Sequence, residues 1–269
     1  MNARLMLCLW LLLIVIDAQA GQACSPQPAS AAALQNAVAS AHVVRRALEQ
    51  RNAPAALVAR MGTDLSAQGL VYSHVGVVLR DRPEGRWTVV HLLNECASDR
   101  SNLYLEGLVN FFADDLVSPQ ARVIWLDPQL AERLAAASME TTWLNLHQPH
   151  YNLLSRPHRL RSQNSTAWIL ELLAIAMQPG ADDRPAAQRW LQSRAYQPDL
   201  VHVPYSKRLL GGLFAANVEF TEHSVQDRLA GRYAVTTVRS IVSFLESQGV
   251  VQAQAEWQGE QALDRLGPL

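Results

Sequence analysis

Residues 71–96 contain two apolar runs rich in β-branched side chains. The runs flank a polar segment, residues 81–86, that contains Pro83 and Gly85. Such runs on either side of a short polar turn are typical of an antiparallel hairpin. Each predicted strand carries one histidine, His74 or His91, among apolar neighbours.

Much of the remaining chain has apolar residues at helical spacing. Residues 31–60 form an alanine-rich lead-in that we expect to be helical, with Pro54 breaking it or starting a second helix. The strongest helical pattern covers residues 162–177, whose polar first turn offers N-caps that include Asn164 and Ser165. These elements predict an α+β fold, in which a small antiparallel sheet seeded by the hairpin packs on this central helix, with extra helices around it.

Shorter elements are expected along the rest of the chain. The patterns predict helices over residues 103–116, 127–138, 184–194 and 225–229, a strand over 121–126, an extended connection over 196–204, a helix or loop over 207–215, and helical or mixed structure over 235–245. From residue 254 onward we expect a frayed, flexible tail.

The N-terminal residues have the order of a secretory signal. Arg4 precedes an almost wholly apolar run over residues 5–16, and Ala18-Gln19-Ala20 follows it. This order is typical of a signal peptide, here residues 1–20, that is cleaved on export. No later segment is apolar over the roughly 20 residues that span a bilayer. We therefore expect an exported protein, periplasmic or secreted, with a single domain over residues 21–253 and a tail over 254–269.

Composition and cysteines narrow the possible classes. With 49% hydrophobic residues in 269, the chain can bury one substantial core. A formal net charge of -1 and the lack of a long basic run argue against nucleic acid as a partner. Cys8 falls in the predicted signal peptide, so Cys24 and Cys96 remain as an even pair in an oxidising compartment. They are the candidates for one disulfide.

Three histidines, His147, His150 and His158, fall within a dozen positions and raise the question of a metal site. A metal needs a defined set of ligands, and no matching pair of carboxylates or cysteines lies nearby in the sequence. Pro149 also prevents a regular helix that would present these side chains on one face. We interpret them as polar loop histidines and expect neither a metal nor a cofactor.

Three segments share the order of a known type of site. Tyr72-Ser73-His74-Val75-Gly76-Val77 opens the first predicted strand, His91 lies on the second, and Asn164-Ser165-Thr166-Ala167-Trp168-Ile169 starts the central helix. Together they resemble the circularly permuted papain-like proteins of the NlpC/P60 superfamily, which include the lecithin retinol acyltransferase-like group. The resemblance implies a permuted papain-like fold in which His74 is the base and His91 orients it.

A longer set of segments is similar to one bacterial family. Ser73-His74-Val75-Gly76, Leu92-Leu93-Asn94, Tyr151-Asn152-Leu153-Leu154 and Gln163-Asn164-Ser165 together resemble the DUF2145 family, an exported group without an assigned activity. This resemblance covers most of the predicted mature chain. It implies a family and leaves the function open.

The sequence departs from the papain-like pattern at the nucleophile. Ser165 stands where that family has a cysteine. A cysteine at a helix N-terminus becomes a thiolate because the helix dipole and a nearby imidazole lower its pKa. A serine hydroxyl gains less from the dipole and needs a well-placed base.

Three hypotheses follow. The site has lost its chemistry and remains as a groove that binds cell-wall peptide or lipid, with Tyr72, Tyr151 and Asn164 as candidate binding residues. Alternatively, Ser165 is a nucleophile with His74 as base and His91 as its orienter, in a hydrolase or acyltransferase acting on amide or ester bonds. In the third hypothesis the protein is structural or interacts with other proteins, and Ser165 only caps its helix.

Overall fold

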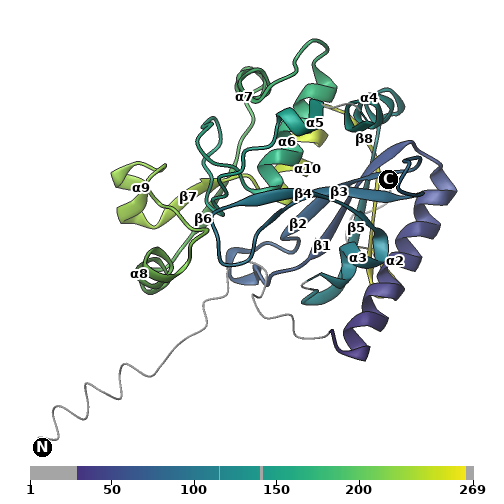
Figure 1. The fold of residues 1–269 in the computed structure, drawn as a ribbon, viewed down its shortest axis with the longest axis horizontal. Coiled ribbons are helices and arrows are strands. Elements are labelled where there is room, and N and C mark those ends of the chain that lie inside the picture. The colour runs from purple at the N-terminus through teal and green to yellow at the C-terminus, as the bar shows by residue number, and fades with distance from the viewer. Residues whose placement is uncertain (1–28, 115, 140–141, 265–269) are drawn as a thin grey trace, which may run out of the picture.

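A computed structural model describes residues 29–264, apart from residues 115, 140 and 141. One antiparallel sheet runs through the molecule, with the strand order β4-β3-β2-β1-β5-β8-β9 (Figure 1). The prediction of an α+β fold with an antiparallel sheet is confirmed. The strands are β1 (Ala55–Met61), β2 (His74–Leu79), β3 (Thr88–Asn94), β4 (Ser101–Gly107), β5 (Ser118–Leu126), β8 (Val251–Gln258) and β9 (Gln261–Leu263).

Helices cover both faces of this sheet (Figure 1). A short 3₁₀ helix, η1 (Ser66–Gln68), lies between β1 and β2. On one face lie α4 (Pro128–Met139), α5 (Thr142–Asn145), α6 (Ser165–Met177), α7 (Arg184–Ser193) and α10 (Val238–Ser247), and on the other lie α2 (Ala31–Arg51) and α3 (Leu108–Ala113).

Alternate residues of the hairpin identify the two faces of the sheet. Val75, Val77 and Val90 pack in the core that contains the apolar side chains of α6, and we call this side the α6 face. Val78 and Val89 pack in a second core with α2 and α3, and we call that side the α2 face. Because successive side chains of a strand point to opposite faces, every residue of β2 and β3 can be assigned to one of them.

The predicted hairpin is confirmed as β2 and β3. The pairing is antiparallel, with Val77 opposite Val90 and Leu79 opposite Thr88. Both strands are buried throughout, because helices cover the sheet on each side. This explains why the two runs are almost continuously apolar instead of alternating with polar residues.

The helical lead-in is confirmed only as far as α2. Ser30 caps this helix by accepting a hydrogen bond from the Ala33 N–H, and Asn52 ends it in the left-handed conformation. The prediction of a second helix after Pro54 is wrong, because β1 follows. β1 pairs with β2 and β5 and is buried on both faces, so its alanines and leucine fill tight core positions.

Two further predictions are corrected by the sheet. The helix expected over residues 103–116 is β4 followed by α3, with Gly107 as the N-cap residue between them. The frayed tail expected from Gln254 is wrong for the described residues, because β8 pairs with β5 from Leu126 to Gln120, and β9 then pairs with β8. The alanines, glutamines and glutamate of β8 favour a helix locally, but pairing within the sheet outweighs this propensity.

The central helix is confirmed as α6, which begins at Ser165. The Asn164 side chain caps it by accepting a hydrogen bond from the Ala167 N–H. α6 packs against β2, β3, α4, α7 and α10, so nearly all of its side chains are buried.

Among the residues that the structure describes, no helix has both the length and the apolar character needed to cross a membrane.

A smaller unit projects from one end of the molecule, at the left of Figure 1. It contains a two-stranded antiparallel sheet and two helices, around a small core that includes Tyr233 and Val235. The extended connection predicted over residues 196–204 therefore contains a strand. The elements are β6 (Asp199–His202), α8 (Tyr205–Phe214), α9 (Val225–Ala230) and β7 (Arg232–Val235).

Candidate functional site

The two hairpin histidines form a directly hydrogen-bonded pair. His74 Nε2 lies 2.8 Å from His91 Nδ1, and both side chains are buried. The approach depends on Gly76, because a Cβ at that position would lie 3.3 Å from His91 Cβ and 2.5 Å from Val89 Cγ1. The sequence therefore provides a histidine on each strand and a glycine that leaves room for them to meet.

A carboxylate extends the pair toward the sheet edge. Glu106 of β4 places Oε2 3.3 Å from His91 Nε2. Because a carboxylate accepts hydrogen bonds, this contact favours a proton on His91 Nε2. When His91 carries only that proton, its Nδ1 accepts a hydrogen bond from His74 Nε2–H. The remaining His74 nitrogen, Nδ1, is then the one that can accept a proton.

An arginine lies on the other side of His74. Arg60 of β1 stands opposite His74 in the strand register, and its Nη2 donates to Asp114 Oδ2 over 2.7 Å. The Phe111 ring of α3 covers the group, with its centroid 5.2 Å from the Arg60 guanidinium carbon, 5.8 Å from the His74 ring and 5.3 Å from the His91 ring. We call Arg60, His74, His91, Glu106 and Asp114 the histidine–arginine cluster.

The cluster has a strong effect on the charge of His74. Burial, then the positive charge of Arg60, then the proximity of His91 hold the pKa of His74 well below its usual value of 6.5. Desolvation and a neighbouring cation both disfavour the imidazolium form. His74 is therefore neutral at neutral pH and can accept a proton or a hydrogen bond.

Ser165 has different partners. It is buried at the start of α6, close to the buried phenol of Tyr151. Burial raises the pKa of Tyr151, so this phenol stays protonated at neutral pH. Asn164 caps the same helix turn, and its Nδ2 donates to the Leu153 carbonyl over 3.2 Å. The structure thus brings Ser165, Tyr151 and Asn164 together.

The sheet lies between these two groups of residues. His74 and His91 contact Phe111, which belongs to the core of the α2 face, whereas α6 and Tyr151 belong to the core of the α6 face. The described geometry therefore pairs His74 with His91 and does not bring Ser165 to either histidine. Within the described residues, no hydroxyl or thiol hydrogen-bonds to His74 or His91.

Tyr72 and Cys96 belong neither to the histidine–arginine cluster nor to the group around Ser165. Tyr72 is buried in the core of the α6 face, and its hydroxyl donates to the Ala121 carbonyl over 3.4 Å. Cys96 takes part in a disulfide. Cys24 and Cys8 both lie outside the described residues, so the expected Cys24–Cys96 pairing stays a prediction.

The three loop histidines have separate partners. His147 Nε2 lies 3.1 Å from the Ser101 hydroxyl, and His150 lies between Asp99 and Glu219. His158 lines a surface pocket of about 270 Å³ with Arg156 and Arg159. In the part of the chain that the structure describes, no group of three or more histidine, cysteine, aspartate or glutamate side chains is arranged to hold a metal ion.

Sequence reasoning missed the charged members of the cluster. Arg60, Glu106 and Asp114 all lie in segments whose sequence pattern predicts helices. One signal was present, because Arg60 is the only charged residue in the apolar run of β1. A single arginine in a buried strand requires an anionic or polar partner, which points to a site.

Comparison with known families gives a clear result for most of the chain. The model of a family described as "Uncharacterized protein conserved in bacteria (DUF2145)" matches residues 47–245, which is well over half of the sequence. The chain belongs to the DUF2145 family. The DUF2145 match includes Ser165 and the whole histidine–arginine cluster, and it ends before β8. Comparison with curated proteins found no match, and comparison with solved structures found none either.

Proposed function

We propose that this DUF2145 protein is exported to the bacterial periplasm, where it binds cell-wall peptide without cleaving it, through the histidine–arginine cluster. The single observation that carries the proposal is the line of contacts from the partly exposed Glu106 to the buried His91 and His74, beside the Arg60–Asp114 pair. Charged and ionisable groups are rarely buried together unless they are paired or functional. The signal-like N-terminal residues support export.

The exposure of the cluster suggests which ligand group it receives. Arg60, His74 and His91 are buried, whereas the side chains of Glu106 and Asp114 are 23% and 21% exposed. A ligand therefore meets carboxylates first, and a carboxylate binds ammonium and amide N–H groups. Cell-wall peptides carry free ammonium groups and amides. An acyl chain would need an apolar groove instead, so a lipid fits this rim less well.

The placement of Ser165 favours binding over hydrolysis. A serine nucleophile needs its hydroxyl within hydrogen-bond reach of the base that takes its proton. Ser165 lies at the start of α6, close to Tyr151 on the α6 face and away from His74. The histidine pair supports a degenerate papain-like site in which His74 is the base and His91 orients it. The position of Ser165 does not support a role for this residue as the nucleophile of that site.

The direct test is retention of the purified mature protein on isolated sacculi, followed by titration with soluble muropeptides. We expect saturable binding, weakened at least tenfold by Glu106→Gln together with Asp114→Asn. The matched control is Glu84→Gln, which removes an exposed carboxylate from the hairpin turn. Equal binding by the double variant and the control would reject the proposed site, provided that all three proteins unfold at similar temperatures.

The same assay separates the other two hypotheses. Release of peptide products by the wild type, and its loss in Ser165→Ala, would establish an active hydrolase and overturn the binding proposal. Retention no greater than that of an unrelated exported protein would also overturn it, in favour of a structural or interaction protein. We expect Ser165→Ala to bind sacculi as the wild type does.

A further inference from the structure

The two helices of the projecting unit expose matched apolar pairs. On α8, Tyr205 and Leu209 are 71% and 53% exposed, and on α9, Val225 and Leu229 are 62% and 77% exposed. Residues four apart lie on the same side of a helix, so each pair forms a short apolar stripe. Large apolar side chains with this exposure, grouped on neighbouring elements, are typical of an interaction surface.

A hydrogen bond links the two helices. The Arg208 guanidinium donates to the Arg228 carbonyl, which joins α8 to the last turn of α9. Gly231, which follows α9 with φ of 66°, allows this approach, because a Cβ there would lie 2.8 Å from the Val203 carbonyl oxygen and 3.4 Å from the Arg208 guanidinium carbon. The two stripes therefore belong to one end of the molecule (Figure 1).

In each of the two helices, an arginine directly precedes the second residue of the apolar pair. Arg208 precedes Leu209 and Arg228 precedes Leu229, so each guanidinium lies within about 100° of its stripe around the helix. The side chains of Arg208 and Arg228 are both partly exposed. Each helix therefore places a positive charge next to its exposed apolar side chains.

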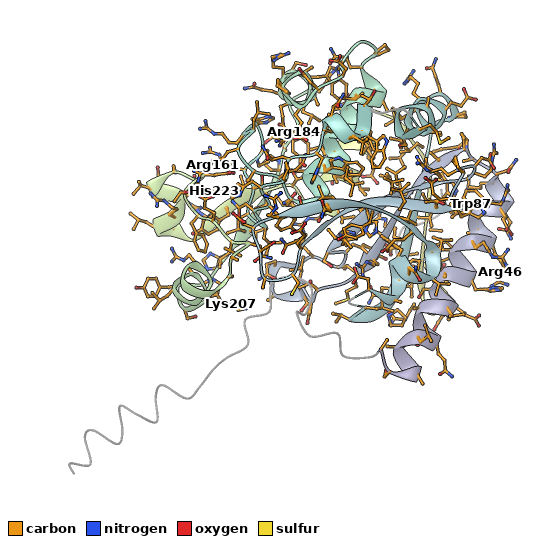
Figure 2. The ribbon with its side chains drawn as sticks, viewed as in Figure 1. Arg46, Trp87, Arg161, Arg184, Lys207 and His223 are labelled. Carbon is orange, nitrogen blue, oxygen red and sulfur yellow. The ribbon has the colours of Figure 1, made fainter. Side chains whose placement is uncertain are left out.

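We propose that this surface, defined by Tyr205, Arg208, Leu209, Val225, Arg228 and Leu229, docks on a membrane that contains anionic phospholipid. The apolar pairs enter the boundary between headgroups and acyl chains, and headgroup phosphates accept hydrogen bonds from the two guanidinium groups. Apolar stripes combined with cations are the pattern that binds an anionic lipid interface. Lys207 and Arg232 add to the positive charge of this end, and Asp227 is the acidic residue of the two helices (Figure 2 labels Lys207).

The one acidic residue of the two helices, Asp227, is held at the start of α9. Asp227 accepts a hydrogen bond from the Ser224 hydroxyl over 2.7 Å at the start of α9. By helical spacing, Asp227 and Lys207 lie on the sides of their helices away from the apolar pairs. The side toward the proposed lipid therefore carries apolar residues and arginines.

The test is co-flotation of the full mature chain with vesicles. We expect binding to vesicles of phosphatidylglycerol and phosphatidylcholine, and at least tenfold weaker binding to phosphatidylcholine alone. Leu209→Asp with Leu229→Asp, and separately Arg208→Gln with Arg228→Gln, should each reduce binding to the anionic vesicles at least tenfold. The second double variant removes charge while leaving the apolar pairs in place.

The chain provides a matched control on another helix. Leu34 and Val38 of α2 are 49% and 47% exposed and also lie four residues apart, without a charged residue between them. Leu34→Asp with Val38→Asp should leave vesicle binding unchanged. An equal loss in this control, or no binding of the wild type to anionic vesicles, would overturn the proposal. Loss of a self-associated dimer in the α8 and α9 variants, measured by sedimentation without vesicles, would instead identify the surface as a contact between copies of this chain.

Discussion

His74 Nε2 and His91 Nδ1 lie 2.8 Å apart on adjacent strands, on the face of the sheet that α2 and α3 cover. In the proposed site, His91 is the side chain that orients His74. The helix that was expected to bring a nucleophile covers the opposite face. The histidine pair is thus surrounded by charged groups from β1, β4 and the end of α3.

Replacing Gly76 with alanine is expected to destabilise the fold by about 1–3 kcal/mol, because an overpacked core must shift its strands. The new Cβ would lie 2.5 Å from Val89 Cγ1 and 3.2 Å from the Val90 carbonyl oxygen. Urea unfolding at neutral pH measures the change. Gly107→Ala is the control, since no atom lies within 4 Å of its added Cβ, and it should cost less than about 1 kcal/mol through the weaker helix cap. Equal losses in both variants would contradict the close approach of β2 and β3.

Stability should fall on acidification below about pH 6.5, because the pKa of His74 is lower in the folded protein than in the unfolded chain. Above that pH both states leave His74 neutral, so the stability is fully present. As the pH falls toward the lower folded pKa, the unfolded chain binds the proton first, which lowers the free energy of the unfolded state relative to the folded state. Burial also lowers the pKa values of His147 and His223, which act in the same direction.

The contribution of His74 can be isolated by comparing urea unfolding at pH 7.5 and pH 5.5. His74→Gln should show a smaller loss of stability between the two pH values than the wild type. His42→Gln changes an exposed histidine of α2 and should keep the wild-type loss. If all three proteins lost the same amount, His74 would not be the group that titrates.

Glu171→Gln is expected to destabilise the protein by about 3–5 kcal/mol, because breaking a buried ion pair leaves the partner charge uncompensated. Glu171 is fully buried in α6, and its carboxylate accepts two hydrogen bonds from Arg184, at 2.8 and 3.1 Å. Figure 2 labels Arg184. For the exposed pair of Arg45 and Glu49, Glu49→Gln should cost only about 0.3–0.5 kcal/mol. Thermal unfolding compares the two, and a similar shift would show that Glu171 is not held as described.

Asn164→Ala should destabilise the protein by about 1–2 kcal/mol, at the upper end for a lost N-cap. Its side chain accepts from the Ala167 N–H and the Thr166 hydroxyl and donates to the Leu153 carbonyl, so the substitution removes three hydrogen bonds of a buried residue. Ser30→Ala, at the exposed N-cap of α2, should cost about 0.5 kcal/mol. Chemical denaturation of both variants checks the order, and a larger loss for Ser30→Ala would contradict it.

Local sequence was enough to predict the hairpin and several helices. β2 and β3 are β-branched around a turn, and α6 has a cap, a continuous apolar run and a stop. β1 and β8 were missed for a physical reason. Their alanines, glutamines and leucine favour helices locally, and only pairing with β2 and β5 makes them strands.

The histidine pair was predictable and its surroundings were not. His74 and His91 are visible as isolated polar residues on two predicted strands. Both faces of these strands are apolar, so the sequence contains no local signal for which face α6 covers. Arg60 and Glu106 reach the pair through β1 and β4, and their position follows from strand order, which depends on contacts between distant residues.

The position of β8 has a consequence for how the chain reaches its folded state. β5 lies between β1 and β8, so its second edge stays open until residues 251–258 arrive. Contacts over such sequence separations form slowly, and an unpaired strand edge is a template for aggregation. A chain that stopped at residue 245, where the family match ends, would keep that edge permanently exposed. β8 and β9 thus protect the newly made chain from pairing with its neighbours.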